Sequence, residues 1–504
     1  MDFALPEYNL RLMLPELVLF VAALLVMTYD VMTKRRSGRT VGYLAMAGLL
    51  LAGVVLAFTG QGRGFGSMFY NDTMALFFKV IFLTAAFMAA GSCFGLTETR
   101  IVNHRGEFFG LMMLSTVGMM FLASSRELVS LYIGLELTTV PLFVLAGFFK
   151  DDRRSVEAGI KYLIVGALSS ALLLYGLSFL YGLTGTTDIF AMRFSLAETW
   201  LAREGLVGAS VMVLAIVAIV AGLGFKLALP PFHQWVPDVY EGAPTPVTAF
   251  LSVGSKAAGI VAFVKIVVVG LYSYYEPVMA PNDWGIMVGA LAAAALIVGN
   301  VLAIRQTNIK RMLAYSSIAH AGYVMVGMVS INELGLSAVA FYMFAYLFTN
   351  MGAFAIVALF EDKTGSCEIA AYDGLARSAP FLAGALTVFL LSLTGIPPLA
   401  GFVGKFYVFA AAIKMAGQPS GGPWLYWLVG VGLLTSVFAL YYYANIMKMM
   451  YFGKSETPAS PAVGTPAVLV IALGLAGVLL FGVYPQPIID FVSGMSLSYG
   501  LLLP

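Results

Sequence analysis

Residues 222–260 read GLGFKLALPPFHQWVPDVYEGAPTPVTAFLSVGSKAAGI, a stretch that joins apolar runs, paired prolines and two lysines. Lys226 and Lys256 both lie in apolar surroundings typical of a membrane span. A charge at the centre of such a span costs about 3 kcal/mol, so it is rarely found there without a function. A buried lysine also gives up its proton readily, because the loss of water disfavours its charged form. The stretch therefore predicts a membrane protein that handles protons.

The overall composition indicates a protein that crosses the membrane many times. Of the 504 residues, 60% are hydrophobic and 11% are charged, more apolar surface than a soluble fold can bury. The net charge of +2 does not indicate binding to nucleic acid. Cys93 and Cys367 lie far apart, and His104, His233 and His320 lack metal-ligand spacing. No Gly-rich phosphate loop is present, so we expect no metal or other cofactor in this chain.

Apolar runs of spanning length, about 20 residues, recur fourteen times. They lie near residues 10–32, 41–59, 73–95, 107–124, 127–149, 157–183, 208–229, 248–272, 284–304, 310–331, 334–360, 380–412, 424–452 and 465–484. We therefore expect an all-α polytopic membrane protein of about 14 transmembrane helices, with both termini on one side. The Pro-rich segment 230–247 could re-enter as a short second half of the seventh helix.

The distribution of basic residues predicts the orientation. The loops of one face carry Lys34, Arg35, Arg36, Arg39, Arg100, Arg105, Lys150, Arg153, Arg154, Arg305, Lys310, Arg311, Lys363, Arg377, Lys448 and Lys454. The loops of the other face carry only Arg11, Arg63, Arg126, Arg193, Arg203 and Lys414. The first face carries sixteen basic loop residues and the second face six. We therefore expect the first face to be cytoplasmic and both termini to lie outside.

Two proline pairs, Pro230–Pro231 and Pro397–Pro398, interrupt the seventh and twelfth spans and predict discontinuous helices there. The two spans are five spans apart, and consecutive spans cross the membrane in opposite directions. An offset of five therefore turns the second broken helix upside down relative to the first, so two repeats of five helices must be inverted relative to each other. Freed carbonyls are tolerated in a membrane only beside protein or water, so each break predicts a wet pocket beside its lysine. The expected units are residues 1–106 (helices 1–3), 107–283 (first inverted repeat, helices 4–8), 284–464 (second inverted repeat, helices 9–13) and 465–504 (helix 14 and the tail).

Glu136, in LYIGLELTTVPLF, and Lys226 are the strongest candidates for a proton-carrying pair. A nearby carboxylate keeps a lysine protonated, and separating the two lets desolvation remove the proton. A small movement would therefore change the proton affinity of Lys226. Lys161, in EAGIKYLIVGAL, could compete for Glu136 or repel Lys226. The alternative is a static ion pair that only helps the helices to pack.

Three further residues could continue the relay. Lys256 lies among small residues that leave room for water. Lys405 follows its proline pair by seven residues, about two helical turns, and would be the exit toward the outer side. His320, in RMLAYSSIAHAGY, titrates near neutral pH and could bridge Lys256 and Lys405. The alternatives are a structural, hydrogen-bonded His320 and a Lys256 whose amine reaches the membrane surface.

Two other lysines are weaker candidates. Lys79, in ALFFKVIF, and Lys265, near the end of its span, are equally well explained by side chains that extend to the membrane surface. His233 could simply cap the break that follows Pro231.

Three long stretches resemble a known family. They are KLALPPFHQWVPDVYEGAPTPVTAFLSVGSKAAG at 226–259, NIKRMLAYSSIAHAGY at 308–323 and SLTGIPPLAGFVGKFYVF at 392–409. They are similar to signature stretches of the antiporter-like subunits of respiratory complex I. That family also includes the large subunits of Mrp-type cation/proton antiporters and of membrane-bound hydrogenases. The resemblance covers roughly spans 4–13.

Within that family the chain looks most like the subunit N branch. It ends after the fourteenth span, carries lysine at position 405, and has the third-span stretch YNDTMALFFKVIFL at 70–83. The essential residues of the family fall here on Glu136, Lys226, Lys256 and Lys405, and Lys161 matches an auxiliary lysine.

The resemblance implies a proton-translocating subunit of NADH:quinone oxidoreductase in a bacterial cell inner membrane, with both termini periplasmic. Flavin, iron–sulfur clusters and quinone would lie in partner subunits, and this chain would contact lipid and adjacent antiporter-like subunits. One alternative is a subunit of a secondary Na⁺/H⁺ antiporter, although sodium prefers carboxylates or freed carbonyls to lysines. Another is a passive scaffold, which a central row of titratable residues fits less well.

Overall fold

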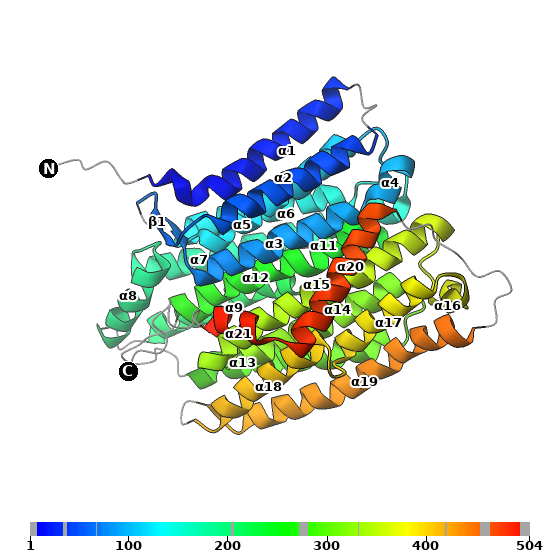
Figure 1. The fold of residues 1–504 in the computed structure, drawn as a ribbon. Helices are drawn as coiled ribbons and strands as arrows, with labels where there is room; N and C mark the ends of the chain where they lie inside the picture. The colour runs from blue at the N-terminus through cyan, green and yellow to red at the C-terminus, as the bar shows by residue number, and fades with distance from the viewer. Residues whose placement is uncertain are drawn as a thin grey trace.

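The protein is a bundle of helices that run roughly parallel or antiparallel to one another (Figure 1). The computed structural model describes residues 8–33, 38–66, 68–202, 206–271, 281–330, 332–418, 421–453 and 464–493. Within these residues, twelve helices are long and apolar enough to cross a membrane. Five basic residues used to predict the orientation lie outside the described residues, namely Lys34, Arg35, Arg36, Arg203 and Lys454.

The first part of the chain forms three long helices and a small hairpin. The elements are η1 (Leu10–Met13), α1 (Leu14–Met32), α2 (Thr40–Ala57), β1 (Gly62–Gly64), β2 (Phe69–Asn71), α3 (Thr73–Ser92) and α4 (Phe94–Thr99). The strands pair antiparallel, with Arg63 opposite Tyr70. Asp72 begins α3 as its N-cap, because its Oδ1 accepts a hydrogen bond from the backbone N–H of Ala75 at 2.6 Å.

The middle of the chain carries the first quoted stretch. Its elements are α5 (Arg105–Ser124), α6 (Leu128–Ala146), α7 (Arg153–Thr184), α8 (Ile189–Ala202), α9 (Leu206–Leu227), α10 (Trp235–Gly242), α11 (Thr245–Phe250), η2 (Leu251–Ser255), α12 (Lys256–Phe263) and η3 (Val264–Gly270). The last four elements form one continuous helical run in which η2 and η3 are π-helical. Residues 228–234, which separate α9 from α10, are called the first break below.

The last part begins with α13 (Pro281–Ala303) and continues to α21. The further elements are α14 (Ile309–Met328), α15 (Glu333–Thr364), η4 (Ile369–Tyr372), α16 (Leu375–Ser378), α17 (Pro380–Thr394), α18 (Ala400–Ala416), α19 (Trp424–Phe452), α20 (Thr465–Val483) and α21 (Gln486–Ser493). Residues 395–399, between α17 and α18, are called the second break.

Twelve of the fourteen predicted spans coincide with described helices that are long and apolar enough to cross a membrane, and the predicted spans 310–331 and 380–412 do not. The single expected span 380–412 is two helices, α17 and α18, because the left-handed Gly395 (φ 94°) ends α17. The helix α8 was not expected, since its sequence was assigned to a loop. The helix α14 lies where a span was predicted, but it is not among the twelve most apolar helices, and its first turn carries Lys310 and Arg311.

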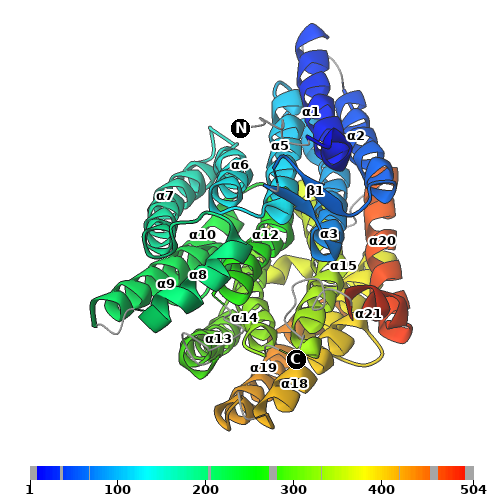
Figure 2. The ribbon, with the colours of Figure 1, turned by 90° about the vertical axis from the view of Figure 1, so that its left-hand side faces the viewer.

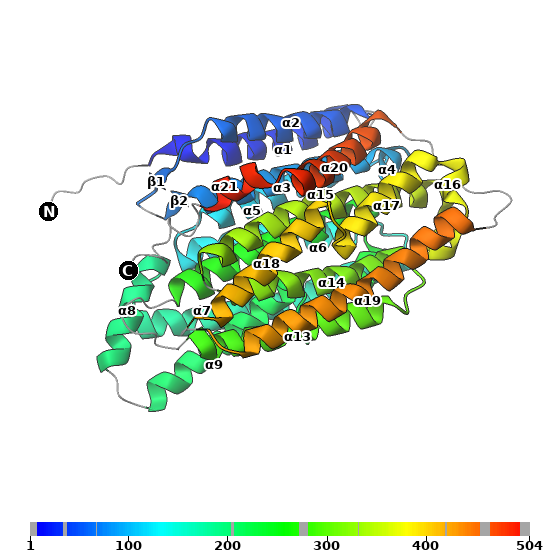
Figure 3. The same ribbon diagram turned by 60° about the horizontal axis from the view of Figure 1, so that its bottom comes forward.

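The run from α11 to η3 lies at the centre of the bundle, together with α15. Every residue in the most apolar window of Thr245–Gly270 is buried, against one third for α1 and α19 at the edges. Seen from the end where the N-terminus lies, α1 and α2 are at the top, α18 and α19 at the bottom, and α12 between them (Figure 2). The helices α19 and α20 cross the outside of the bundle (Figure 3). Lys256 therefore lies on the helix most completely shielded from lipid.

Candidate functional site

Four titratable side chains from four different helices are buried inside the bundle. They are Lys226 on α9, Lys256 on α12, His320 on α14 and Lys405 on α18, each no more than 6% exposed. A lysine whose amine extended to the membrane surface would not be this deeply buried. Burial of this kind is tolerated only where polar partners compensate for the lost water. The partners of each residue therefore decide what the row can do.

Lys226 contacts the helix that carries Glu136. Its Nζ donates a hydrogen bond to Thr139 Oγ1 on α6 at 2.6 Å. Thr139 follows Glu136 by three residues, so the two share one face of α6. The charge of Glu136 acts on Lys226, but no ion pair within 4.0 Å joins these two described residues. Glu136 Oε1 is buried without a hydrogen-bond partner in the described part of the chain, which leaves it free to accept one.

The first break begins immediately after Lys226. Ala228 adopts a left-handed conformation (φ 61°), and the N–H of Leu229 donates to the carbonyl of Gly224 at 2.8 Å, which closes the end of α9. Trp235 Nε1 donates at 3.2 Å to the carbonyl of Phe225, which also accepts from the N–H of Ala228 at 3.1 Å. A Cβ at Gly259 of α12 would lie 3.2 Å from Lys226 Cβ, a tight contact, so the glycine helps the two helices to approach closely.

Lys256 is held by Ser317 on α14. Its Nζ donates to both the carbonyl oxygen and the hydroxyl of Ser317, and that hydroxyl lies 3.2 Å from Tyr240 Oη. Lys256 also lines a small cavity of about 10 Å³, the size of a single water, together with His320 and Tyr342. The amine thus has a hydroxyl, a carbonyl and a water-sized space within reach.

His320 lies between Lys256 and Lys405. Its Nδ1 is hydrogen-bonded to Tyr342 Oη at 2.6 Å, and its ring packs 5.8 Å from the ring of Tyr323. The charges of both Lys256 and Lys405 act on it. Two of the predicted relay residues, Lys256 and Lys405, therefore lie near this imidazole, one across the shared cavity and one across the Tyr323 ring.

Lys405 sits against the second break. Its Nζ donates to the carbonyl of Thr394 at 2.9 Å, to Ser436 Oγ at 3.3 Å, and lies 4.3 Å from the centre of the Tyr323 ring. The Thr394 carbonyl is free because α17 ends there. A Cβ at Gly395 would lie 3.0 Å from Lys405 Cδ, so the glycine provides space for the lysine as well as the left-handed turn.

Lys161 is placed differently from the expectation. Its Nζ lies 2.6 Å from Glu157 Oε1 and 2.6 Å from Asp238 Oδ2 on α10, and its side chain is 41% exposed. It therefore binds acidic groups beside the first break and not Glu136. Asp238 is shared with Arg311, whose Nη1 lies 2.8 Å from both Asp238 and Glu241.

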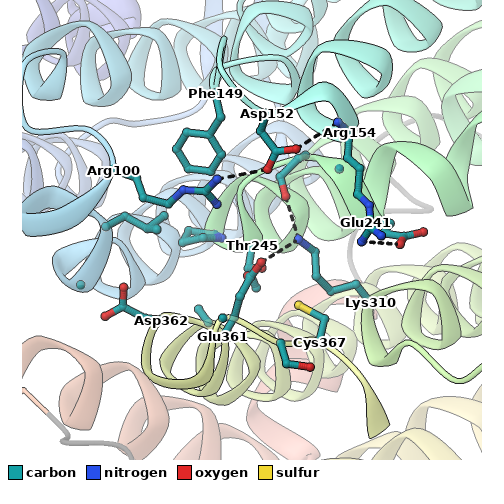
Figure 4. A pocket seen from close by; sticks show the side chains of 18 of the residues that line it. Arg100, Phe149, Asp152, Arg154, Glu241, Thr245, Lys310, Glu361, Asp362 and Cys367 are labelled. Atoms are coloured by element: carbon teal, nitrogen blue, oxygen red, sulfur yellow. Dashed lines mark hydrogen bonds and ion pairs between the residues drawn. The ribbon is translucent and has the colours of Figure 1, made fainter. Parts of the chain in front are cut away.

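This ion-pair network adjoins a charged pocket of about 650 Å³ (Figure 4). The pocket is lined by residues from the ends of seven helices and their loops, including Arg100, Asp152, Glu241, Lys310 and Glu361. Lys310 is 2% exposed, donates to the carbonyl of Ala243 at 2.8 Å and lies 3.6 Å from Glu361 Oε1. Thr245 Oγ1 donates to Glu361 as well.

The pocket was missed by the sequence analysis, which treated Lys310 and Arg311 only as loop charges. The signal was present in Asp238 and Glu241, two acids directly after the first proline pair. At the rim of the pocket, burial raises the pKa of Asp152, but hydrogen bonds from Arg100 and from the backbone of Arg154 outweigh it. The pKa therefore lies below its usual value and the carboxylate is ionised at neutral pH.

The interpretation of Lys79 and Lys265 as surface-reaching side chains is wrong. Lys79 is fully buried and lies 2.5 Å from Glu16 Oε1, and Lys265 is 5% exposed and donates to the carbonyl of Ser125 at 2.6 Å. Within the described residues, no group of three or more His, Cys, Asp or Glu side chains is arranged to hold a metal ion.

Comparison with known proteins places the chain in a family. Residues 125–439 match the family described as "NADH:quinone oxidoreductase/Mrp antiporter, TM". The chain is 39% identical to NADH-quinone oxidoreductase subunit N of Desulforamulus reducens, over 98% of this chain and 99% of the relative. It is 41% identical to the protein of the same name in Moorella thermoacetica, over 97% of this chain and 99% of the relative.

Solved structures agree with this placement. A chain of respiratory complex I from Thermus thermophilus with bound aureothin superposes with a TM-score of 0.76 at 30% identity, covering 94% of this chain and 98% of that one. A chain of the Mrp complex from Dietzia shares the fold alone, with a TM-score of 0.80 at 20% identity, covering 97% and 98%. The chain therefore belongs to the NADH:quinone oxidoreductase/Mrp antiporter membrane family, in its subunit N branch.

Proposed function

We propose that this chain conducts protons across the membrane as one channel of a NADH:quinone oxidoreductase. The observation that carries the proposal is the buried row of Lys226, Lys256, His320 and Lys405, with Glu136 near its start. Buried ionisable residues in membrane helices mark proton and ion pathways. The electron transfer that drives the movement takes place in other subunits, which carry the flavin, the iron–sulfur clusters and the quinone site.

The transfer begins at Lys226. While Glu136 is close, its charge keeps the amine protonated. A movement of α6 that increases their separation favours loss of the proton, which passes toward Lys256 through the close approach of α9 and α12 at Gly259. Lys256 passes it to His320 through the water-sized cavity that both line. Lys405 then receives the proton and releases it on the other side.

Protons reach Lys226 through the charged pocket. The pocket lies at the end of the bundle where α4 and α16 are found (Figure 1). Its basic residues Arg100, Arg154 and Lys310 belong to the more positive set of loops, which puts this end in the cytoplasm. From there Glu241, Asp238 and Lys161 lead to the first break, which adjoins Lys226.

The same proposal includes the architecture expected from the sequence. Fourteen spans in a bacterial inner membrane place both termini in the periplasm. Residues 107–283 and 284–464 are inverted repeats, with 1–106 and 465–504 as additions, and the two breaks make one helix of each repeat discontinuous. Adjacent antiporter-like subunits of the complex contact the outer helices and deliver the movement that separates Glu136 from Lys226.

The test is the substitution of Lys226 in the intact complex, reconstituted in vesicles. Lys226→Ala removes the proton carrier, and Lys226→Arg keeps a charge that cannot be released because arginine does not deprotonate. Both variants are expected to abolish the proton pumping that depends on this chain, measured as acidification per electron transferred from NADH to quinone. Full pumping and electron transfer in Lys226→Arg would contradict the proposal.

The same vesicles test the antiporter alternative, since the family to which the chain belongs also includes Mrp antiporters. Sodium is bound by carboxylates and carbonyls, whereas the described row consists of lysines, a histidine and hydroxyls. We therefore expect pumping to require electron transfer and to be independent of sodium. Proton exchange that depends on sodium and proceeds without NADH would assign the chain to a secondary antiporter.

A further inference from the structure

A second buried charge pair lies away from the row, between α1 and α3. Lys79 Nζ lies 2.5 Å from Glu16 Oε1, and both side chains are fully buried. Oε1 of Glu16 is paired with the Lys79 ammonium, whereas Oε2 is buried and has no hydrogen-bond partner among the described residues. Buried carboxylates that only stabilise a fold normally have their oxygens hydrogen-bonded, because an unsatisfied buried acceptor is costly. Oε2 of Glu16 is therefore open to a further hydrogen-bond donor.

The surroundings of Lys79 are polar on one side. Its Nζ also donates to Asn71 Oδ1 at 2.6 Å and lies 4.9 Å from the centre of the Phe69 ring. Ser124 Oγ donates to the same Asn71 oxygen at 2.7 Å, and Asn71 Nδ2 donates to the carbonyl of Leu12 at 3.0 Å. The hydrogen bonds thus run from Lys79 to η1 and the β1–β2 hairpin, at the end of the bundle opposite the charged pocket (Figure 1).

Lys265 connects this pair to the central row. It lies on the same helical run as Lys256, nine residues further on, which corresponds to about 13 Å along the axis. Its Nζ donates to the carbonyl of Ser125, the residue after Ser124, and the charges of Lys79 and Asp72 act on it. Lys256 directly follows the π-helical segment η2, and Lys265 lies within the π-helical segment η3; such irregularities are frequent at functional sites.

We propose that Lys265, Lys79 and Glu16 form a second proton-release branch, which leads from Lys256 to the end of the bundle at the β1–β2 hairpin. The Lys79 ammonium gives its proton to the Glu16 carboxylate, which leaves a neutral amine beside a neutral carboxylic acid. Glu16 then releases the proton to water at that end, and the Lys265 ammonium reprotonates Lys79. Lys265 in turn receives a proton from Lys256. This branch rests on the proposed function, since it takes its protons from the row.

The test compares Lys79→Arg with Lys226→Arg and with Lys414→Arg, a matched change at an exposed lysine of α18. Arginine preserves the charge pair with Glu16 but cannot deprotonate. In the reconstituted complex, Lys79→Arg is expected to lower pumping per electron toward the level of Lys226→Arg, while electron transfer continues and Lys414→Arg remains at the wild-type level. Wild-type pumping in Lys79→Arg would overturn the branch.

A second variant tests the branch if the complex that carries Lys79→Arg does not assemble. The double change Glu16→Gln and Lys79→Gln removes both charges, so no unpaired charge stays buried. Lowered pumping in this variant, with intact electron transfer, supports the branch, and wild-type pumping overturns it. The failure of the branch is distinguishable from that of the proposed function. The branch alone fails if Lys226→Arg stops pumping and both Lys79 variants pump normally, and both fail if Lys226→Arg pumps normally.

Discussion

The two breaks carry a lysine beside a proline pair, yet they hold that lysine in different ways. At the first break, Lys226 is the penultimate residue of α9, donates to the side chain of Thr139 and feels the charge of Glu136. At the second, Lys405 lies one and a half turns into α18 and donates to the main-chain carbonyl of Thr394. The first lysine lies near a carboxylate, whereas the second is held by neutral groups. The difference suits a gate at the start of the row and a release site at its end.

The surroundings of the two breaks also differ in their acidic side chains. The first break continues into α10, whose Asp238 and Glu241 bind Lys161 and Arg311 beside the charged pocket. Around Lys405 the described contacts are Tyr323, Ser436 and the Thr394 carbonyl, none of them a carboxylate. Acids that reach the surface suit proton uptake at the first break, and the absence of a carboxylate among the described contacts of Lys405 favours loss of a proton from that lysine.

The largest effect that tests this comparison is expected for Glu136→Gln. Glutamine keeps the shape of the side chain but removes the charge that holds the Lys226 proton, so the gate stays in its released form. Pumping by this chain should fall at least about tenfold, equivalent to about 1.4 kcal/mol in the proton equilibrium. The measurement is the initial rate of vesicle acidification at a fixed rate of NADH oxidation. Unchanged pumping would mean that Lys226 needs no carboxylate, and the two breaks would then be equivalent.

A smaller effect is expected from the residues that shape each break. Gly395→Ala should destabilise the protein by about 1–2 kcal/mol, because an L-residue is strained at φ 94° and its Cβ meets Lys405. Ala228→Gly, at φ 61°, relieves such strain and should change stability by less than about 1 kcal/mol. Thermal unfolding of the two purified variants against the wild type measures both. An equal loss of stability in the two variants would contradict the idea that the left-handed turn at Gly395 requires glycine and the one at Ala228 does not.

The elements were largely predictable from the sequence, whereas the contacts of the site were only partly so. Apolar length predicted the helices, and isolated charges in apolar runs marked Lys226, Lys256 and Lys405 as buried. Neither signal says which helix lies opposite a given side chain. The placement of Lys161 on Asp238, and of Lys79 on Glu16 sixty-three residues earlier, depends on how distant helices pack. Lys310 looked like a loop charge because it begins a helix, and only the fold buries it against Glu361.

The smallest effects separate the hydrogen-bond partners of the two lysines. Thr139→Val removes the only hydrogen bond that the structure gives to Lys226 Nζ within the described residues, so the amine should shift toward Glu136 and pumping should fall several-fold. Ser436→Ala leaves Lys405 with the Thr394 carbonyl at 2.9 Å and the Tyr323 ring, and the lost bond is the longer one at 3.3 Å. A bond this long contributes about 1 kcal/mol or less, so pumping should stay within about fivefold of wild type. Both variants are compared in the same acidification assay. A greater loss of pumping in Ser436→Ala than in Thr139→Val would contradict this ranking. It would mean that pumping depends more on the hydrogen bonds of Lys405 than on those of Lys226.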